Sequence, residues 1–208
     1  MPDASLAPPY VAALGALGIV RSFPKNTVLV QEGDKSDQLY VVLSGRLKVY
    51  LADSDGKEII VDTLGPNQYF GEMALDGEPR SASVMTMEAS KLAVVQREDF
   101  KKFLTANPDA ALQLIDALIQ RARNLTRTVG NLALLDVYGR VARLLLDSAV
   151  EASGRLVVAE HMTQQEIAKR VGSSREMVSR ILSDLREGKY ISMENSRIVI
   201  QQQLPKHW

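Results

Sequence analysis

The sequence predicts an α+β protein with a β-rich N-terminal part, one long helix and a C-terminal part of short helices and a hairpin. Three observations predict it. Short apolar runs separated by turn residues fill residues 25–97, a heptad pattern follows residue 107, and a pair of short helices precedes two short strands after residue 160. The 208 residues are 46% hydrophobic and 24% charged, which is typical of a globular protein of one large or two small domains.

The β-rich part contains four apolar runs, at residues 28–34, 38–45, 47–56 and 58–65. Each is short, rich in Val, Ile, Leu and Tyr, and bounded by residues that favour turns. Asp55-Gly56 lies between two of these runs and is a strong hairpin signal. Turn residues recur about every ten residues, which predicts a compact β-sandwich or barrel.

A long helix is predicted to begin at Pro108, since proline is tolerated at the first helical position. Apolar residues then recur at alternating spacings of three and four, which defines a heptad seam. The seam consists of Ile115, Leu118, Ala122, Leu125, Val129 and Leu132. It has two interpretations: the helix packs on its own domain, or it packs against a second copy. The length of the seam favours a parallel two-fold dimer.

The C-terminal part begins with an amphipathic helix near Asp136, which Ser153-Gly154 is expected to end. Thr163 and Glu166 then form a capping box at the start of a second helix. Gly172 is expected to end that helix, and Ser173 or Ser174 to cap a third helix that runs to Gly188. The stretch YISMENSRIVI follows and reads as two strands around Asn195-Ser196.

Two short helices around a three-residue turn, followed by a hairpin, predict a winged helix-turn-helix rather than an ordinary helical hairpin. The second helix of such a unit lies in the major groove of DNA. Arginine can donate two hydrogen bonds to guanine, and glutamate can accept a hydrogen bond from cytosine. The alternative for Glu176 is that its carboxylate only stabilises the N-terminus of the helix through the helix dipole. The candidate DNA-binding residues are Lys169, Ser173, Ser174, Arg175, Glu176, Ser179 and Arg180.

The distribution of charge also favours the C-terminal part of the chain as the binding site for an anionic partner. Lys+Arg and Asp+Glu are both 25 in the whole chain, but residues 137–208 carry 11 basic and 8 acidic residues. There are no cysteines and only two distant histidines, His161 and His207, so no metal site is expected. Signal-peptide and transmembrane patterns are absent, which favours a cytoplasmic protein with no membrane partner. No nucleophile–base set or Walker loop is seen, so an enzyme is not expected.

The stretch FGEMALDGEPRSASV, residues 70–84, places Glu72 and Arg80 among small and apolar residues. A bound small anion explains both charges, because a phosphate would pair with Arg80 and Ser81 while Glu72 accepts from a sugar hydroxyl. An internal Glu72–Arg80 salt bridge explains them equally well. Residue types alone leave both interpretations open.

This stretch resembles the phosphate-binding cassette of cyclic-nucleotide-binding domains, through Phe70-Gly71-Glu72, Ala74-Leu75 and Pro79-Arg80-Ser81-Ala82. Residues 129–146 and 171–182 also resemble the CRP/FNR family of bacterial transcription regulators. The resemblance covers nearly the whole chain and implies a cyclic-nucleotide-binding β-roll (jelly-roll), a dimerisation helix and a winged helix-turn-helix. The implied domains are residues 1–107, 108–136 and 137–208.

The family also implies roles for residues of this chain. Glu72 takes the ribose hydroxyl, Arg80 and Ser81 take the cyclic phosphate, and Arg121 lies near the ligand. The full set of implied ligand-binding residues is Gly71, Glu72, Met73, Ala74, Arg80, Ser81, Ala82, Arg121, Leu125 and Thr126. The implied partners are cAMP, a second copy of the chain, a TGTGA-like inverted repeat in double-stranded DNA, and RNA polymerase.

One departure concerns the base of the ligand. Family members that bind cAMP place a Thr-Ser pair against the purine, but this chain has Leu125-Thr126. Leucine cannot accept a hydrogen bond from an adenine amino group. The main hypothesis is a cAMP-gated switch that acts through a hinge at Leu134-Leu135-Asp136. The alternatives are that the effector is cyclic di-GMP or another purine nucleotide, that base selectivity is weakened, or that the protein binds DNA without a ligand.

Overall fold

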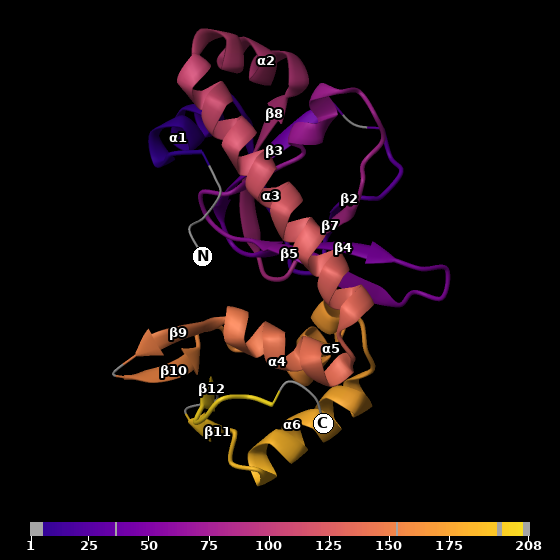
Figure 1. The fold of residues 1–208 in the computed structure, drawn as a ribbon. Helices are drawn as coiled ribbons and strands as arrows, with labels where there is room; N and C mark the ends of the chain where they lie inside the picture. The colour runs from indigo at the N-terminus through magenta and orange to yellow at the C-terminus, as the bar shows by residue number, and fades with distance from the viewer. Residues whose placement is uncertain (1–5, 36, 153, 195–196, 206–208) are drawn as a thin grey trace. The chain divides into compact units, whose positions relative to one another are not determined.

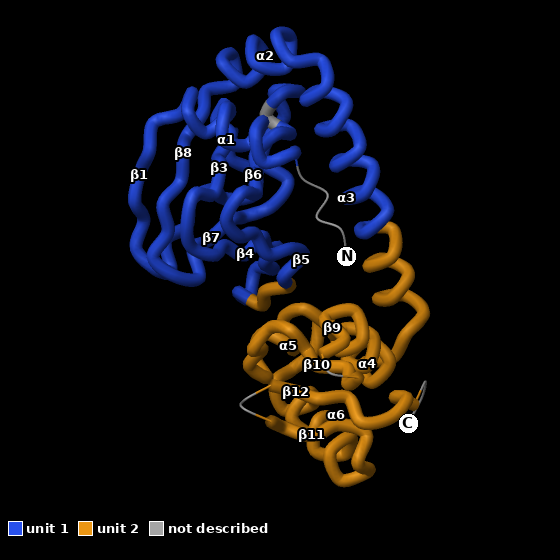
Figure 2. The backbone as a smooth tube through the Cα atoms, turned by 90° about the vertical axis from the view of Figure 1, so that its left-hand side faces the viewer, with its two compact units in different colours: residues 1–56, 60–125 blue, residues 57–59, 126–208 orange. Residues whose placement is uncertain are grey.

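The structure is a computed structural model that describes residues 6–35, 37–152, 154–194 and 197–205. The chain divides into two compact units, residues 1–56 with 60–125, and residues 57–59 with 126–208 (Figure 2). Each unit has its own sheets and its own buried core.

The first unit is a β-roll with helices packed on one of its sheets (Figure 1). Its strands are β1 (Ile19–Phe23), β2 (Val28–Val30), β3 (Gln38–Ser44), β4 (Leu47–Ala52), β5 (Glu58–Leu64, from Ile60 on in this unit), β6 (Tyr69–Phe70), β7 (Ser83–Thr86) and β8 (Ser90–Gln96). Its helices are α1 (Pro8–Ala16), the 3₁₀ helix η1 (Glu72–Leu75), α2 (Arg97–Ala106) and the first part of α3 (Pro108–Leu134).

Two four-stranded sheets face each other in this unit, with strand orders β1-β8-β3-β6 and β2-β7-β4-β5. The pairings are antiparallel, as in Val41 opposite Ala93 and Val49 opposite Val84. Strands β4 and β5 are neighbours, and Gly56 between them has a φ of +76°. The hairpin predicted at Asp55-Gly56 is therefore confirmed.

Alternation along β3 explains why four consecutive residues of this strand are buried. Leu39 and Val41 pack with α1, α2 and α3 on one face of the sheet. Tyr40 and Val42 pack between the two sheets on the other face. Successive side chains of a strand point to opposite faces, so a sheet covered on both sides has a continuous apolar run in its central strand.

Helix α3 begins at Pro108, as predicted, and ends at Leu134. It buries Ala110, Leu114 and Ala117 in the first unit, and these lie on a different row from the heptad seam. The large seam residues are instead 38% to 65% exposed: Ile115, Leu118, Leu125, Val129 and Leu132. The interpretation in which the seam packs on its own domain is therefore wrong for the described chain.

The second unit combines three helices with a four-stranded sheet of order β11-β12-β10-β9. Its elements are α4 (Val137–Asp147), β9 (Ala149–Ala152), β10 (Arg155–Val158), α5 (Gln164–Val171), α6 (Arg175–Glu187), β11 (Ile191–Glu194) and β12 (Arg197–Ile200). The turn predicted at Asn195-Ser196 lies outside the described residues, but Glu194 pairs with Arg197 on either side of it.

The predicted helix-turn-helix is confirmed in its local details. Thr163 and Glu166 form the capping box of α5. Gly172 ends α5 in the left-handed conformation, with a φ of 64°, where a side chain would be strained. Of the two serines expected to cap α6, it is Ser174 whose hydroxyl accepts from the backbone N–H of Met177, at 3.2 Å.

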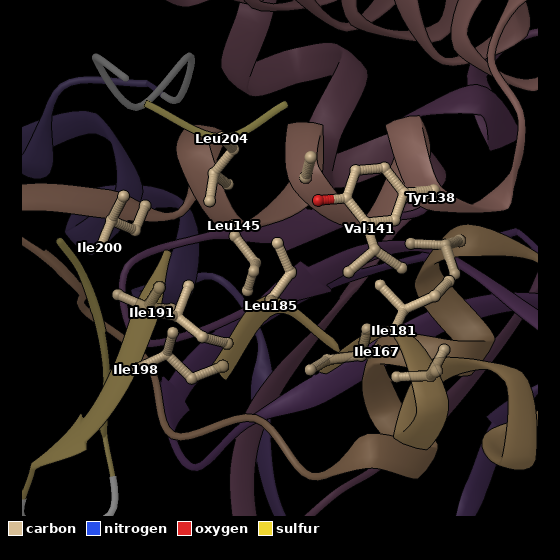
Figure 3. Packing of buried hydrophobic residues seen from close by; sticks show 14 of the residues in the cluster. Tyr138, Val141, Leu145, Ile167, Ile181, Leu185, Ile191, Ile198, Ile200 and Leu204 are labelled. Atoms are coloured by element: carbon tan, nitrogen blue, oxygen red, sulfur yellow. The ribbon is translucent and has the colours of Figure 1, made fainter. Parts of the chain in front are cut away.

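Figure 3 shows the core of this unit, in which side chains from α4, α5, α6 and the sheet point toward one another. Leu145, Ile167 and Leu185 are fully buried and come from three different helices. Ile191 and Ile198 complete the core from the hairpin that follows α6. This packing holds the two helices of the turn at one crossing angle.

One prediction about the second unit needs correction. The amphipathic helix that was expected to reach Ser153-Gly154 ends at Asp147. The residues that follow form the β9–β10 hairpin, in which Val150 pairs with Val157. Alanine and valine are compatible with both states, and the partner strand β12 decides in favour of a strand.

No helix in the described part of the chain has the length and apolarity to span a bilayer.

Candidate functional site

A cavity of about 310 Å³ opens in the first unit against β4, β5, η1 and α3. Most of its wall is apolar, and the strands supply a large part of the apolar side chains. Eight of the ten predicted ligand-binding residues line it: Gly71, Glu72, Met73, Arg80, Ser81, Ala82, Arg121 and Leu125. Residues from positions 71–82 and from α3 are thus brought to one place, as the resemblance implied.

Arg80 is the buried cation of this cavity, with 8% of its surface exposed. Its guanidinium donates to the backbone carbonyl oxygens of Gly71, at 3.3 Å, and of Gln38. Burial lowers the pKa of Arg80, and the nearby charges of Tyr40 and Glu72 offset this effect only in part. A buried guanidinium in that position is further stabilised by an anion.

Gly71 brings the backbone close to Arg80. Its φ is +90°, in the region that favours glycine. A Cβ at this position would lie 2.7 Å from Nη1 of Arg80 and 2.8 Å from the carbonyl oxygen of Gln38. Only glycine therefore allows Arg80 to lie flat against the loop that precedes η1.

Glu72, the first residue of η1, is 7% exposed and forms an ion pair with Arg121 of α3. Arg121 also donates to the carbonyl oxygen of Tyr69, at 3.2 Å, and lies over the Tyr69 ring. Burial is the largest single influence and by itself lowers the pKa of Arg121, but the charge and hydrogen bond of Glu72, together with the attraction to Tyr69 and Asp62, outweigh it and the pKa is raised. The ion pair of Glu72 is thus made with an arginine 49 residues away.

The remaining predicted ligand residues differ in their placement. Ser81 is exposed, and its hydroxyl lies 3.4 Å from the sulfur of Met73. Leu125 lines the cavity from α3 and contributes only apolar surface. Thr126 is exposed on the same helix. Ala74 belongs to η1, and its side chain lies outside the described part of the structure.

A second, more open hollow of about 440 Å³ lies on the outer face of the helix-turn-helix. Arg175, Glu176, Ser179 and Arg180 all line it, so four predicted DNA-reading residues share one face of α6. Gln164 of α5 and Ser183 of α6 line it as well, and no sequence motif distinguishes these two. The face is rich in hydrogen-bonding groups of the kind that contact base edges.

The other predicted DNA-binding residues do not line this hollow, and Lys169 forms an ion pair with Glu58, at 2.5 Å. Ser173 lies in the turn, where its backbone N–H donates to the carbonyl oxygen of Ala168. Ser174 is occupied as the cap of α6, and Lys169 lies in the last turn of α5. A helix N-terminus carries a partial positive charge, so the start of α6 also favours a nearby phosphate.

The described residues hold no group of three or more acidic or histidine side chains that is arranged to bind a metal ion. The chemistry of the two sites is instead that of recognition. One is a partly buried cavity with a cation and a carboxylate, and the other is an exposed polar helix face. Together with the fold, they define a DNA-binding protein with a small-ligand domain.

Comparisons with known proteins agree with this class. Residues 20–107 match the cyclic nucleotide-binding domain family, and residues 139–203 match the Crp-like helix-turn-helix domain family. The chain is 34% identical over 189 residues to the cAMP-activated global transcriptional regulator CRP of Pasteurella multocida, covering 87% of this chain and 89% of the relative. It is 32% identical over 198 residues to the CRP-like cAMP-activated global transcriptional regulator of Mycobacterium tuberculosis, covering 93% and 88%.

Among solved structures, the c-di-GMP responsive global regulator CLP of Xanthomonas campestris is similar, with a TM-score of 0.76 and 26% identity over 94% of this chain and 100% of that one. The catabolite activator protein of Thermus thermophilus has a TM-score of 0.55 and 28% identity, covering 94% and 91%. This chain therefore belongs to the CRP/FNR family of DNA-binding transcription regulators, and that family consists of regulators rather than enzymes.

Proposed function

We propose that this chain is a dimeric regulator whose binding to DNA is switched by a cyclic nucleotide in the cavity at Arg80. The observation that carries the proposal is the gathering of Gly71, Glu72, Arg80 and Arg121 around one cavity. A cyclic phosphate pairs with Arg80, with help from the Ser81 hydroxyl and from the backbone N–H groups near Gly71 and Ala82. The carboxylate of Glu72 accepts from the ribose hydroxyl.

The electrostatics of the cavity favour an anion over a neutral ligand. The burial of Arg80 lowers its pKa, so the protein itself does not fully offset the cost of burying this charge. A phosphodiester supplies one negative charge in the place where the guanidinium lacks water. The neighbouring ion pair between Glu72 and Arg121 places a second cation at the edge of the same ligand.

The size of the cavity supports one mononucleotide. Its volume of about 310 Å³ lies at the low end of ordinary small-ligand pockets, which span about 300–1,000 Å³. Two of the relatives described above are named as cAMP-activated, so cAMP is the first effector to test. The similarity to a regulator described as c-di-GMP responsive supports cyclic di-GMP as the alternative.

The DNA-binding half of the proposal rests on the face of α6. Arg175 and Arg180 donate to guanine and Glu176 accepts from cytosine, which suits a TGTGA-like half-site. Lys169, Ser173, Ser174 and Ser179 supply phosphate contacts, which position the protein without specifying sequence. Two such faces in a dimer would read an inverted repeat with half-sites about 34 Å apart.

Each of the three parts of the chain has one role in the proposed switch. Residues 1–107 hold the effector, residues 108–136 form the dimerisation helix and hinge, and residues 137–208 bind DNA. Arg121 lies on the dimerisation helix and also lines the cavity, so the ligand contacts the element that leads to the hinge. An effector that binds the DNA-competent state more tightly raises its population. RNA polymerase in the cytoplasm is the expected downstream partner.

A gel shift with and without nucleotide tests the proposal. The probe is a synthetic duplex with two inverted TGTGA half-sites, and cAMP, cyclic di-GMP or no ligand is added. A cyclic nucleotide should tighten binding at least about tenfold, which corresponds to a coupling free energy of about 1.4 kcal/mol. Equal affinity in all three arms would show a regulator that binds DNA without a ligand.

The exposed seam of α3 supports the dimer and leads to a separate prediction. Val129, which is 65% exposed in the single chain, should become buried between two copies. Val129→Glu should weaken the dimer strongly, because it would bury a pair of facing carboxylates. Light scattering coupled to size exclusion should show a mass falling toward that of one chain, 22.9 kDa.

Gln120→Glu is the matched control for this variant, because it adds the same charge to α3 outside the seam. It should leave the dimer intact. A monomeric wild-type chain, or dimers of equal stability in both variants, would contradict the two-fold packing along the seam.

A further inference from the structure

Asp62 is a charged residue in the wall of the effector cavity that the sequence analysis did not single out. It lies in β5, two residues from Ile60 and two from Leu64, which are both buried. Asp62 itself is exposed in the single chain, so it lines the cavity at its open side, where solvent reaches the carboxylate. One of its oxygens accepts from the backbone N–H of Thr63, at 2.8 Å.

Asp62 and Arg121 line the same cavity and attract each other electrostatically. Arg121 forms its ion pair with Glu72 and is also attracted by the charge of Asp62. Two carboxylates of the cavity wall therefore act on the guanidinium of Arg121: Glu72 of the cassette, through an ion pair, and Asp62 of β5, through its charge.

The rest of the wall shows where the base of a nucleotide would lie. If Arg80 and Ser81 take the phosphate and Glu72 takes the ribose, the base must extend along the remaining wall. That wall is apolar and is formed by Val49, Leu51, Val61, Leu64 and Leu125. Glu78 also lines the cavity, but it is two residues from Arg80 and belongs to the phosphate side. Among the carboxylates that line the cavity, Asp62 is thus the one left for the base.

A carboxylate selects among purines because it only accepts hydrogen bonds. Guanine offers two adjacent donors, N1–H and the N2 amino group, which match the two oxygens of a carboxylate. Adenine offers one amino group beside an acceptor, N1, which a carboxylate repels. Covering an ionised group with a base that cannot donate to it is costly. Leu125 provides no competing acceptor for adenine on the opposite wall.

We infer that Asp62 reads the base of the effector and that the cavity prefers guanosine 3′,5′-cyclic monophosphate to cAMP. The inference rests on the proposed function and refines it by specifying the base.

Titration calorimetry of the full-length chain with three cyclic mononucleotides, those of guanosine, inosine and adenosine, tests it. Inosine retains N1–H but lacks the N2 amino group, so it removes one of the two donors. The guanosine ligand should bind about tenfold more tightly than the inosine ligand, the loss expected for one hydrogen bond to a charged acceptor. It should exceed the adenosine ligand by at least as much.

Asp62→Asn is the variant, and Asp55→Asn is its matched control. The control makes the same change in the β4–β5 turn, where Asn-Gly is as favourable as Asp-Gly. Asp62→Asn should lower affinity for the guanosine ligand about tenfold and leave the adenosine ligand nearly unchanged, whereas the control should match the wild type. Retained binding of the adenosine ligand also shows that the variant is folded.

The outcomes separate the inference from the proposed function. Tighter binding of cAMP than of the guanosine ligand by the wild type, or an unchanged ratio in Asp62→Asn, would overturn the reading of the base by Asp62 and leave the switch intact. Failure of the wild type to bind any cyclic nucleotide would remove the proposed function, and this inference would fall with it.

Discussion

Replacing Arg80 with alanine is expected to abolish the nucleotide response at ligand concentrations that saturate the wild type. Truncating one partner of a buried, hydrogen-bonded charge pair costs about 2–5 kcal/mol, which corresponds to a loss of about 30-fold to 4,000-fold in affinity. Arg80 is only 8% exposed, so solvent will not replace the lost contact with the phosphate. Titration calorimetry followed by a gel shift measures both the binding and its effect on DNA affinity.

Arg80 also supports the fold, and the design must separate the two roles. Its guanidinium donates to carbonyl oxygens of Gly71 and Gln38, so Arg80→Ala will lower the melting temperature to some extent. Arg80→Lys keeps a cation and should retain weak nucleotide binding, because lysine supplies a point charge without the planar fork. Arg21→Ala removes an exposed arginine from the same unit and should behave as the wild type.

A folded Arg80→Ala protein whose DNA binding still depends fully on the nucleotide would be incompatible with the phosphate site. The protein would then sense its effector elsewhere. Loss of binding in Arg80→Ala with partial binding in Arg80→Lys would instead assign the phosphate to this guanidinium.

Replacing Arg180 with alanine is expected to produce the second large effect, a loss of sequence-specific DNA binding. A bidentate contact between arginine and guanine contributes about 1–3 kcal/mol of discrimination, so affinity for the inverted-repeat duplex should fall about 5-fold to 150-fold. Arg180 lines the polar face of α6 together with Arg175 and Glu176, which places it where base edges are read. Fluorescence anisotropy with the specific duplex and a scrambled duplex measures the effect.

Arg186→Ala is the control, because Arg186 is an exposed arginine in the last turn of the same helix. It removes the same charge far from the N-terminal turns that enter the groove. The control should weaken both duplexes slightly and equally, whereas Arg180→Ala should reduce the ratio between them. Equal ratios in both variants would show that Arg180 contacts phosphate rather than a base.

Local signals explain why so much of the fold was predictable. The capping box at Thr163, the left-handed Gly172 and the Asp55-Gly56 turn each depend on a few consecutive residues. Their conformations follow from side-chain hydrogen bonds and steric limits within one turn of chain. The heptad seam is equally local, because a helix places residues at spacings of three and four on one face.

Contacts between distant residues were less predictable. Arg121 was expected near the ligand only through the resemblance, and its ion pair with Glu72 joins positions 49 residues apart. Asp62 has no motif around it, and its place in the cavity wall depends on how β5 is arranged with the other elements that line the cavity. The β9–β10 hairpin was missed because its residues suit either a helix end or a strand until β12 pairs with them.

The amino-acid sequence alone thus determined the succession of a β-rich domain, a long helix and a helix-turn-helix, together with the residue types available to each site. Only the tertiary structure decided which arginine neutralises Glu72, that Asp62 lines the same cavity, and that the seam of α3 is left exposed by the described part of its own chain. The physical reason is that periodicity and capping act over a few residues, whereas burial and charge pairing depend on side chains that only folding brings together.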